Sequence, residues 1–235
     1  LIETPRYGEN PHQKSALYSK NLNLNINKVH GKQLSYNNYN DIFAALTISK
    51  SLPKNKGTVI IKHANPCGVS IKKNNLESYK SALACDPISA FGGIVSCNYK
   101  ITKNLALELN KIFLEVIIAN GFDKNALKIL KSKKNLRIID ASNYSVKESL
   151  KFISINDSIL TQSEDNRIFS KKDFRIVSKK KPNKSTTTKS KNYDTNSIGE
   201  TICHIQKTQP SLQYYCIKPL YCSKTTISKN NTEKQ

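Results

Sequence analysis

The chain has 235 residues and a formal net charge of +21 at pH 7, a balance common among nucleic-acid-binding proteins. Only four of its 38 basic residues are Arg, however, and the planar guanidinium reads phosphates and base edges best, so we do not expect nucleic-acid binding as its main role. No stretch approaches the roughly 18 apolar residues that span a membrane. No cationic start precedes an apolar run, so we expect a cytoplasmic protein without a membrane partner.

The first half of the chain alternates expected strands and helices. Residues 58–61 are all β-branched without polar alternation, which is typical of a short strand buried on both faces. A helix is expected from Ile42 to Leu52, with Asn40 or Asp41 as its N-cap. Further helices are expected at 76–85, 103–113 and 124–131, and further strands at 94–97, 115–119 and 136–139. This alternation predicts an α/β fold with a mostly parallel sheet and helices on its faces.

The pattern changes after residue 145. Short apolar runs at 152–155, 159–162 and 174–177 are separated by charged turns and predict hairpins. From residue 182 onward there is one Gly and no Arg, and neither a helical face nor a steady alternation persists. This composition predicts an irregular or aberrant tail. We therefore divide the chain into a folded unit, residues 1–181, and a tail, residues 182–235.

Lys62 and His63 stand where the expected buried strand ends. In open α/β sheets, ligands bind in the crevice outside the carboxyl ends of the strands. Imidazole titrates near neutral pH and can accept a proton from a nucleophile, while an ammonium group can stabilise a developing oxyanion. The pair is therefore a candidate for acid–base chemistry, and the alternative is a solvated strand edge without a catalytic role.

Four segments, in this order and spacing, resemble one family. They are RYGENPHQ (6–13), GKQLSYNNYND (31–41), IKHANPCGVS (61–70) and ACDPISAFGGIV (84–95). They resemble the bifunctional purine-biosynthesis family that joins 5-aminoimidazole-4-carboxamide ribonucleotide (AICAR) transformylase to IMP cyclohydrolase. The likeness covers about residues 1–182 and only the first part of the transformylase half. It implies a three-layer, cytidine-deaminase-like unit. The deaminase zinc signature, H-x-E with P-C-x-x-C, is absent here, so we expect no zinc.

The resemblance also implies roles for individual residues. The family's catalytic Lys-His pair falls on Lys62 and His63, and its reaction moves a formyl group from 10-formyltetrahydrofolate to the exocyclic amine of AICAR. His63 would act as the base, and Lys62 would stabilise the tetrahedral oxyanion or aid proton transfer to the leaving folate nitrogen. Implied contacts to the substrate are Arg6, Tyr7, His12, Phe91, Gly92 and Glu115. Taken alone, Arg6 could equally be an exposed charge, His12 a loop histidine and Glu115 a charge at a strand end.

Three hypotheses follow. The chain could be part of an AICAR formyltransferase, whose partners would be AICAR, folate and a second copy in a homodimer. It could instead be an inactive fragment that keeps one unit's fold and at most weak nucleotide binding, because neither the cyclohydrolase nor the second transformylase unit is recognisable in it. It could also be a basic module that binds RNA or acidic surfaces. A further departure from the family is Asn156-Asp157-Ser158, which stands where a glycine-rich turn is expected.

Overall fold

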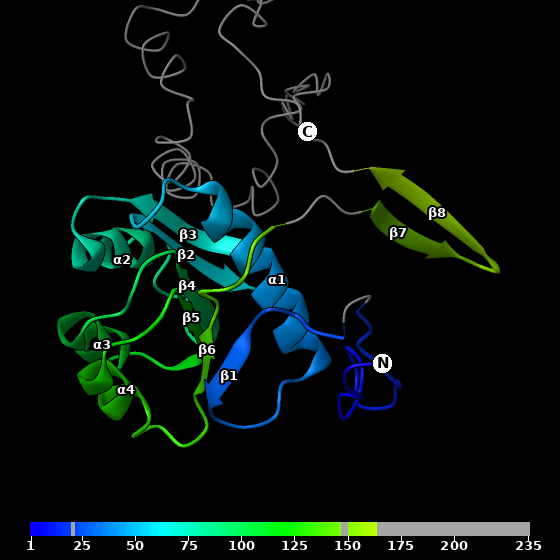
Figure 1. Cartoon of the computed structure of the whole chain (residues 1–235), viewed down its shortest axis with the longest axis horizontal. Helices are drawn as coiled ribbons and strands as arrows, with labels where there is room; N and C mark the ends of the chain where they lie inside the picture. Colours follow the sequence, from blue (N-terminus) through cyan, green and yellow to red (C-terminus); the bar gives the residue numbers. More distant parts are fainter. Residues whose placement is uncertain (20–21, 147–149, 164–235) are drawn as a thin grey trace, which may run out of the picture.

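The computed structural model of the chain describes residues 1–19, 22–146 and 150–163 (Figure 1). Their regular elements alternate for most of the length. They are β1 (Asn27–His30), α1 (Tyr36–Ser51), β2 (Gly57–Lys62), β3 (Asn65–Ile71), α2 (Asn75–Leu83), β4 (Gly93–Cys97), α3 (Lys103–Leu109), β5 (Leu114–Ala119), α4 (Lys124–Leu130), β6 (Arg137–Asp140), β7 (Leu150–Ile155) and β8 (Ser158–Ser163). The expected strand at 174–177 and the expected tail lie outside the described residues.

Six strands form one sheet in the order β1-β6-β5-β4-β2-β3. The strands β4, β5 and β6 are parallel, whereas β1 runs antiparallel to β6, and β2 runs antiparallel to both β4 and β3. The α/β prediction is confirmed, but the sheet is mixed because the chain reverses directly after β2. His63 and Ala64 form that reversal, both with positive φ.

The strand β3 was not expected, because Asn65-Pro66 and Gly68 look like signals that end regular structure. Pro66 is tolerated because β3 is the last strand of the sheet, and the register with β2 shifts between Ile60 and Ile61 beside it. Proline in sheets is confined to such edge strands and bulges.

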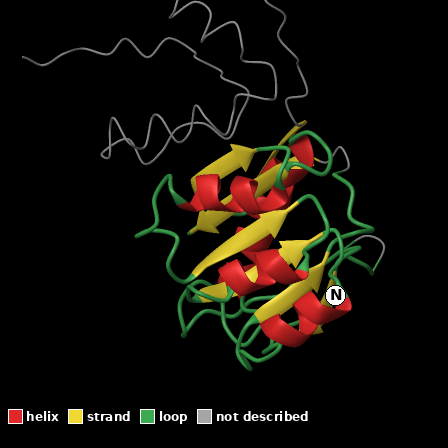
Figure 2. Cartoon of the chain, turned by 90° about the vertical axis from the view of Figure 1, so that its left-hand side faces the viewer, coloured by secondary structure: helices red, strands yellow, loops and turns green. Residues whose placement is uncertain are grey.

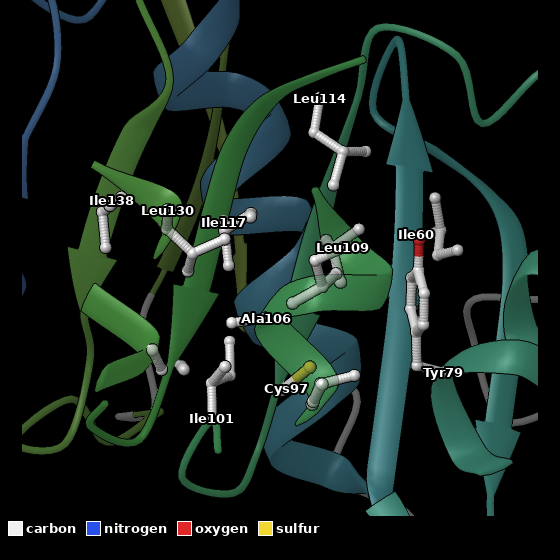
Figure 3. Packing of buried hydrophobic residues seen from close by; sticks show 14 of the residues in the cluster. Ile60, Tyr79, Cys97, Ile101, Ala106, Leu109, Leu114, Ile117, Leu130 and Ile138 are labelled. Atoms are coloured by element: carbon white, nitrogen blue, oxygen red, sulfur yellow. The ribbon is translucent and has the colours of Figure 1, made fainter. Parts of the chain in front are cut away.

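Helices cover both faces of the sheet. The helix α1 lies on one face and α2, α3 and α4 lie on the other, as Figures 1 and 2 show. Val59 and Ile61 pack in the cluster on the α1 side, whereas Ile60 packs in the cluster on the other side. Figure 3 shows this second cluster, to which Leu109 of α3 and Ile117 of β5 both contribute. A strand segment whose successive side chains enter two different cores must be apolar throughout, which explains the sequence of residues 59–61.

The helix α1 begins earlier than expected. Ser35 is its N-cap, and Ser35 and Asn38 form a capping box in which each side chain accepts the other residue's backbone N–H. Neither Asn40 nor Asp41 is the cap, so that prediction is wrong. Asp41 instead lies in the second turn of α1, where its carboxylate is available for a tertiary contact.

Among the described residues, β7 and β8 pair with each other and with no other strand, which confirms the hairpin predicted from the runs at 152–155 and 159–162. Asn156, at positive φ, occupies the turn where the resemblance led us to expect glycine. Asn is among the residues that tolerate this conformation best. No helix in the described part of the chain is both long and apolar enough to cross a membrane.

Candidate active site

The candidate site lies at the edge of the sheet that is formed by strand ends, where β2 ends and β4 and β5 begin. The strand β2 ends at Lys62 and runs antiparallel to β4, so its carboxyl end meets the amino ends of β4 and β5. Ile61 pairs with Ile94, and Gly93 pairs with Leu114. We predicted a crevice outside the carboxyl ends of parallel strands. Here β2 meets the site with its carboxyl end, but β4 and β5 meet it with their amino ends, so the prediction is wrong for β4 and β5. Because the sheet is mixed, the Lys62–His63 pair lies at the edge opposite to the carboxyl ends of β4 and β5.

The ammonium group of Lys62 is held against the turn that precedes β4. Its Nζ donates to the carbonyl oxygen of Phe91 at 3.2 Å and to that of Gly92 at 3.0 Å. The half-buried side chain therefore has a fixed position. The ring of Phe91 packs against Phe113 at 5.3 Å between centroids and is still 64% exposed. The structure thus brings together Lys62, Phe91 and Gly92, three of the predicted site residues.

Gly92 is required here for two reasons. Its φ is +69°, and a Cβ at this position would lie 2.9 Å from Lys62 Nζ. We expect Gly92→Ala to destabilise the fold by about 1–2 kcal/mol through the left-handed backbone and to displace Lys62. Urea unfolding measures the first effect, and AICAR affinity measures the second.

The matched control is Gly121→Ala, because Gly121 has φ +96° but its nearest side-chain neighbour would be 3.6 Å away. Both variants should lose comparable stability, and only Gly92→Ala should lose AICAR affinity. Equal losses of affinity in the two variants would contradict the role given to Gly92.

His63 is exposed and lies in the reversal between β2 and β3. Its φ is +52° and that of Ala64 is +58°. The carboxylate of Asp41 accepts the N–H of Ala64 at 2.6 Å. Burial raises the pKa of Asp41, and this rise is partly offset by the Ala64 N–H and by the nearby His63. The helix α1 is thus joined directly to the turn that carries His63.

Glu115, at the start of β5, lies in a small polar cluster at the same edge. Its Oε2 accepts the side-chain N–H of Asn38 at 2.9 Å and lies 3.6 Å from a guanidinium nitrogen of Arg137. The Nε of Arg137 also donates to the Gln33 carbonyl oxygen at 3.2 Å. Glu115 interacts electrostatically with Asp41 as well. Sequence reasoning did not place Asn38, Asp41 and Arg137 at the site. Which end of each strand borders the site depends on strand direction, and the sequence alone did not show that β2 and β4 are antiparallel.

Arg6, Tyr7 and His12 form a separate group on the N-terminal segment. The guanidinium of Arg6 stacks on the ring of Tyr7 at 5.3 Å, and His12 is exposed. In the described part of the chain, neither Arg6 nor Tyr7 forms a hydrogen bond or ion pair with Lys62 or His63.

The N-terminal segment is nevertheless joined to the start of α1. Tyr39 donates to the Glu3 carboxylate, and the Asn37 side chain donates to the Glu9 carbonyl oxygen at 3.3 Å. The first two turns of α1 therefore contact the N-terminal segment, the His63 turn and Glu115.

Cys67 follows the Lys-His pair closely but is a poor candidate for a nucleophile. It is 5% exposed, and burial raises the pKa of its thiol to about 12. The thiol form, which is a weak nucleophile, therefore dominates at neutral pH. Among the described residues, no three His, Cys, Asp or Glu side chains are grouped so that they could hold a metal ion.

Comparison with known proteins agrees with the motifs. The model of the AICARFT/IMPCHase bienzyme family matches residues 2–192. The chain belongs to this family. All of the site residues described above lie within the matched AICARFT/IMPCHase region.

Several relatives in the AICARFT/IMPCHase family are similar to this chain. The bifunctional purine biosynthesis protein PurH of Bacillus cereus is 42% identical over 183 residues, which are 75% of this chain and 36% of that protein. PurH of Acetivibrio thermocellus is 39% identical over 190 residues, 77% of this chain and 37% of that protein. PurH of Bacillus cytotoxicus is 42% identical over 183 residues, with the same 75% and 36% shares. The chain thus spans just over a third of the length of these relatives.

Proposed function

We propose that residues 1–181 are the first unit of an AICAR transformylase, with a cytidine-deaminase-like fold, and that residues 182–235 are a separate tail. The family membership supports this proposal, together with the placement of Lys62 and His63 at one sheet edge. The unit would take part in formyl transfer from 10-formyltetrahydrofolate to AICAR during purine biosynthesis. The observation that carries the proposal is the fixed Lys62 ammonium, followed directly in the chain by the exposed His63, in a chain of this family.

The transfer needs a base because the AICAR amine is conjugated with the carboxamide-bearing ring and is a weak nucleophile. The amine nitrogen would attack the formyl carbon while His63 accepts one N–H proton. The tetrahedral intermediate would collapse by breaking the bond from carbon to folate N10, and N10 would take up the proton that His63 accepted from the amine, which returns His63 to its neutral form. The products are formylated AICAR and tetrahydrofolate, so atoms and charges balance.

Lys62 suits the stabilisation of the oxyanion. A lysine ammonium has three N–H donors, and Lys62 directs two of them to the carbonyl oxygens of Phe91 and Gly92. The third donor is left for the oxygen on which negative charge develops. Since the first two bonds fix the nitrogen beforehand, little reorganisation is needed during the reaction.

The remaining predicted residues would hold the nucleotide. Arg6 is suited to the phosphate through its two-pronged geometry, and Tyr7 and His12 lie on the same segment. Glu115 would accept hydrogen bonds from the base or ribose, and Phe91 offers an exposed ring beside Lys62. The remaining length of the PurH relatives would supply the rest of the folate site, the cyclohydrolase and the homodimer contacts.

Calorimetry with AICAR tests the binding half of this proposal. The 235-residue chain should bind AICAR saturably, and Arg6→Ala should weaken binding at least about tenfold through loss of a charge-assisted phosphate contact. Lys103→Ala is the control, because this exposed residue begins α3 at the opposite edge of the sheet. Absence of AICAR binding, together with salt-sensitive RNA binding that survives loss of Lys62 and His63, would favour the basic-module alternative.

A further inference from the structure

The turn that carries His63 has an unfavourable backbone. Both central residues, His63 and Ala64, have positive φ, the pattern of a type I′ hairpin turn. That turn is normally built from Asn-Gly or Asp-Gly, because a Cβ disfavours this conformation. Neither residue here is Gly or Asn, so the conformation depends on contacts from outside the turn.

The main outside contact comes from Asp41 of α1. Its Oδ1 accepts the Ala64 N–H at 2.6 Å, and the His63 backbone N–H also interacts with the same carboxylate. The Asn65 side chain closes the other side by donating to the His63 carbonyl oxygen at 2.7 Å. The carboxylate of Asp41 is half-buried, and burial raises its pKa, so placing a charged group there has a cost.

We infer that Asp41 is a positioning residue that holds His63 in the conformation needed for proton transfer. This inference rests on the proposed function, since it gives a purpose to the His63 orientation. Asp41 anchors the turn through the Ala64 N–H, and its charge faces His63 and Glu115.

Amide exchange in the 235-residue chain tests the anchoring directly. Asp41→Ala should speed exchange of the Ala64 N–H at least about tenfold and shift the NMR signals of the His63 ring. Asp41→Asn keeps an oxygen acceptor and should change Ala64 exchange less than Asp41→Ala does. The Ile60 N–H, inside β2, serves as the internal control for global stability.

A second variant separates positioning from general damage to the fold. Because glycine adopts positive φ freely, Ala64→Gly in the Asp41→Ala background should return the His63 ring signals toward those of the unmodified chain. Unchanged Ala64 exchange in Asp41→Ala, or ring signals that Ala64→Gly leaves displaced, would overturn the inference.

Formyl transfer gives the functional readout. It is assayed in a chimera in which residues 1–182 of this chain replace the matching segment of a full-length PurH relative. Asp41→Ala should lower kcat at least about tenfold while the KM for AICAR changes much less, and Ala64→Gly should recover part of kcat. A fall in affinity without a fall in kcat would overturn the positioning role. If the unmodified protein transfers no formyl group, the proposed function fails, whereas the exchange and ring signals still decide whether Asp41 holds the turn.

Discussion

Replacing His63 by alanine is expected to lower the rate of formyl transfer by about 100-fold to 10,000-fold, the usual contribution of a general base. The physical reason is that the AICAR amine cannot complete its attack while it keeps its proton. The affinity for AICAR should change little, because the phosphate and ribose contacts are assigned to other residues. The measurement is the steady-state rate in a protein of the PurH relatives' full length that contains residues 1–182.

Rescue with added imidazole distinguishes a missing base from a damaged site. His63 is exposed, so the space left by its ring is accessible to small molecules in solution. Imidazole should restore part of the activity of His63→Ala and none of the activity of a Lys62→Ala variant. Normal turnover by His63→Ala without imidazole would eliminate the proposed mechanism.

Gly68→Ala is expected to cost about 3 kcal/mol of stability or more, a large fraction of the 5–15 kcal/mol that folded domains have. A Cβ at Gly68 would lie 2.0 Å from the carbonyl oxygen of Ala82 and 3.3 Å from Cys85 Cβ. The obstructing atom belongs to the backbone of α2, so β3 and α2 would have to separate. Chemical denaturation of the 235-residue chain measures the loss.

Gly121→Ala again provides the comparison, since it introduces the same methyl group at ordinary van der Waals distance from its neighbours, at the cost of a strained φ. The loss in Gly68→Ala should exceed the loss in Gly121→Ala by at least about 1–2 kcal/mol. Similar losses in both variants would show that β3 and α2 can move apart easily.

The Gly68 contact illustrates what sequence patterns could and could not predict about the fold. The strand at 58–61 was predictable because every residue is β-branched, and Val59, Ile60 and Ile61 each enter one of two cores. The strand β3 was missed because Asn65-Pro66 and Gly68 carry turn signals. In fact Pro66 sits at a sheet edge, and Gly68 is small because a helix carbonyl approaches it, neither of which local sequence reveals.

The same limit explains which site residues were predictable. Lys62 and His63 could be singled out because adjacent acid–base groups follow a buried strand. Asp41 has the sequence signature of a helix cap. In the structure Ser35 is the cap instead, and the Asp41 carboxylate accepts the Ala64 N–H. Arg137 was missed because it starts a strand, at an edge that becomes the candidate site only when β2 and β4 are antiparallel.

The most direct test is to locate AICAR on the 235-residue chain by following its backbone amide signals during a titration. The proposed site predicts saturable shifts at the edge formed by Lys62, His63 and Gly92, together with Arg6 and Tyr7 of the N-terminal segment. Asn98 and Asn120, which follow β4 and β5 at the opposite edge, should not shift. Shifts centred on Asn98 and Asn120, with Lys62 and His63 unaffected, would contradict the proposed site.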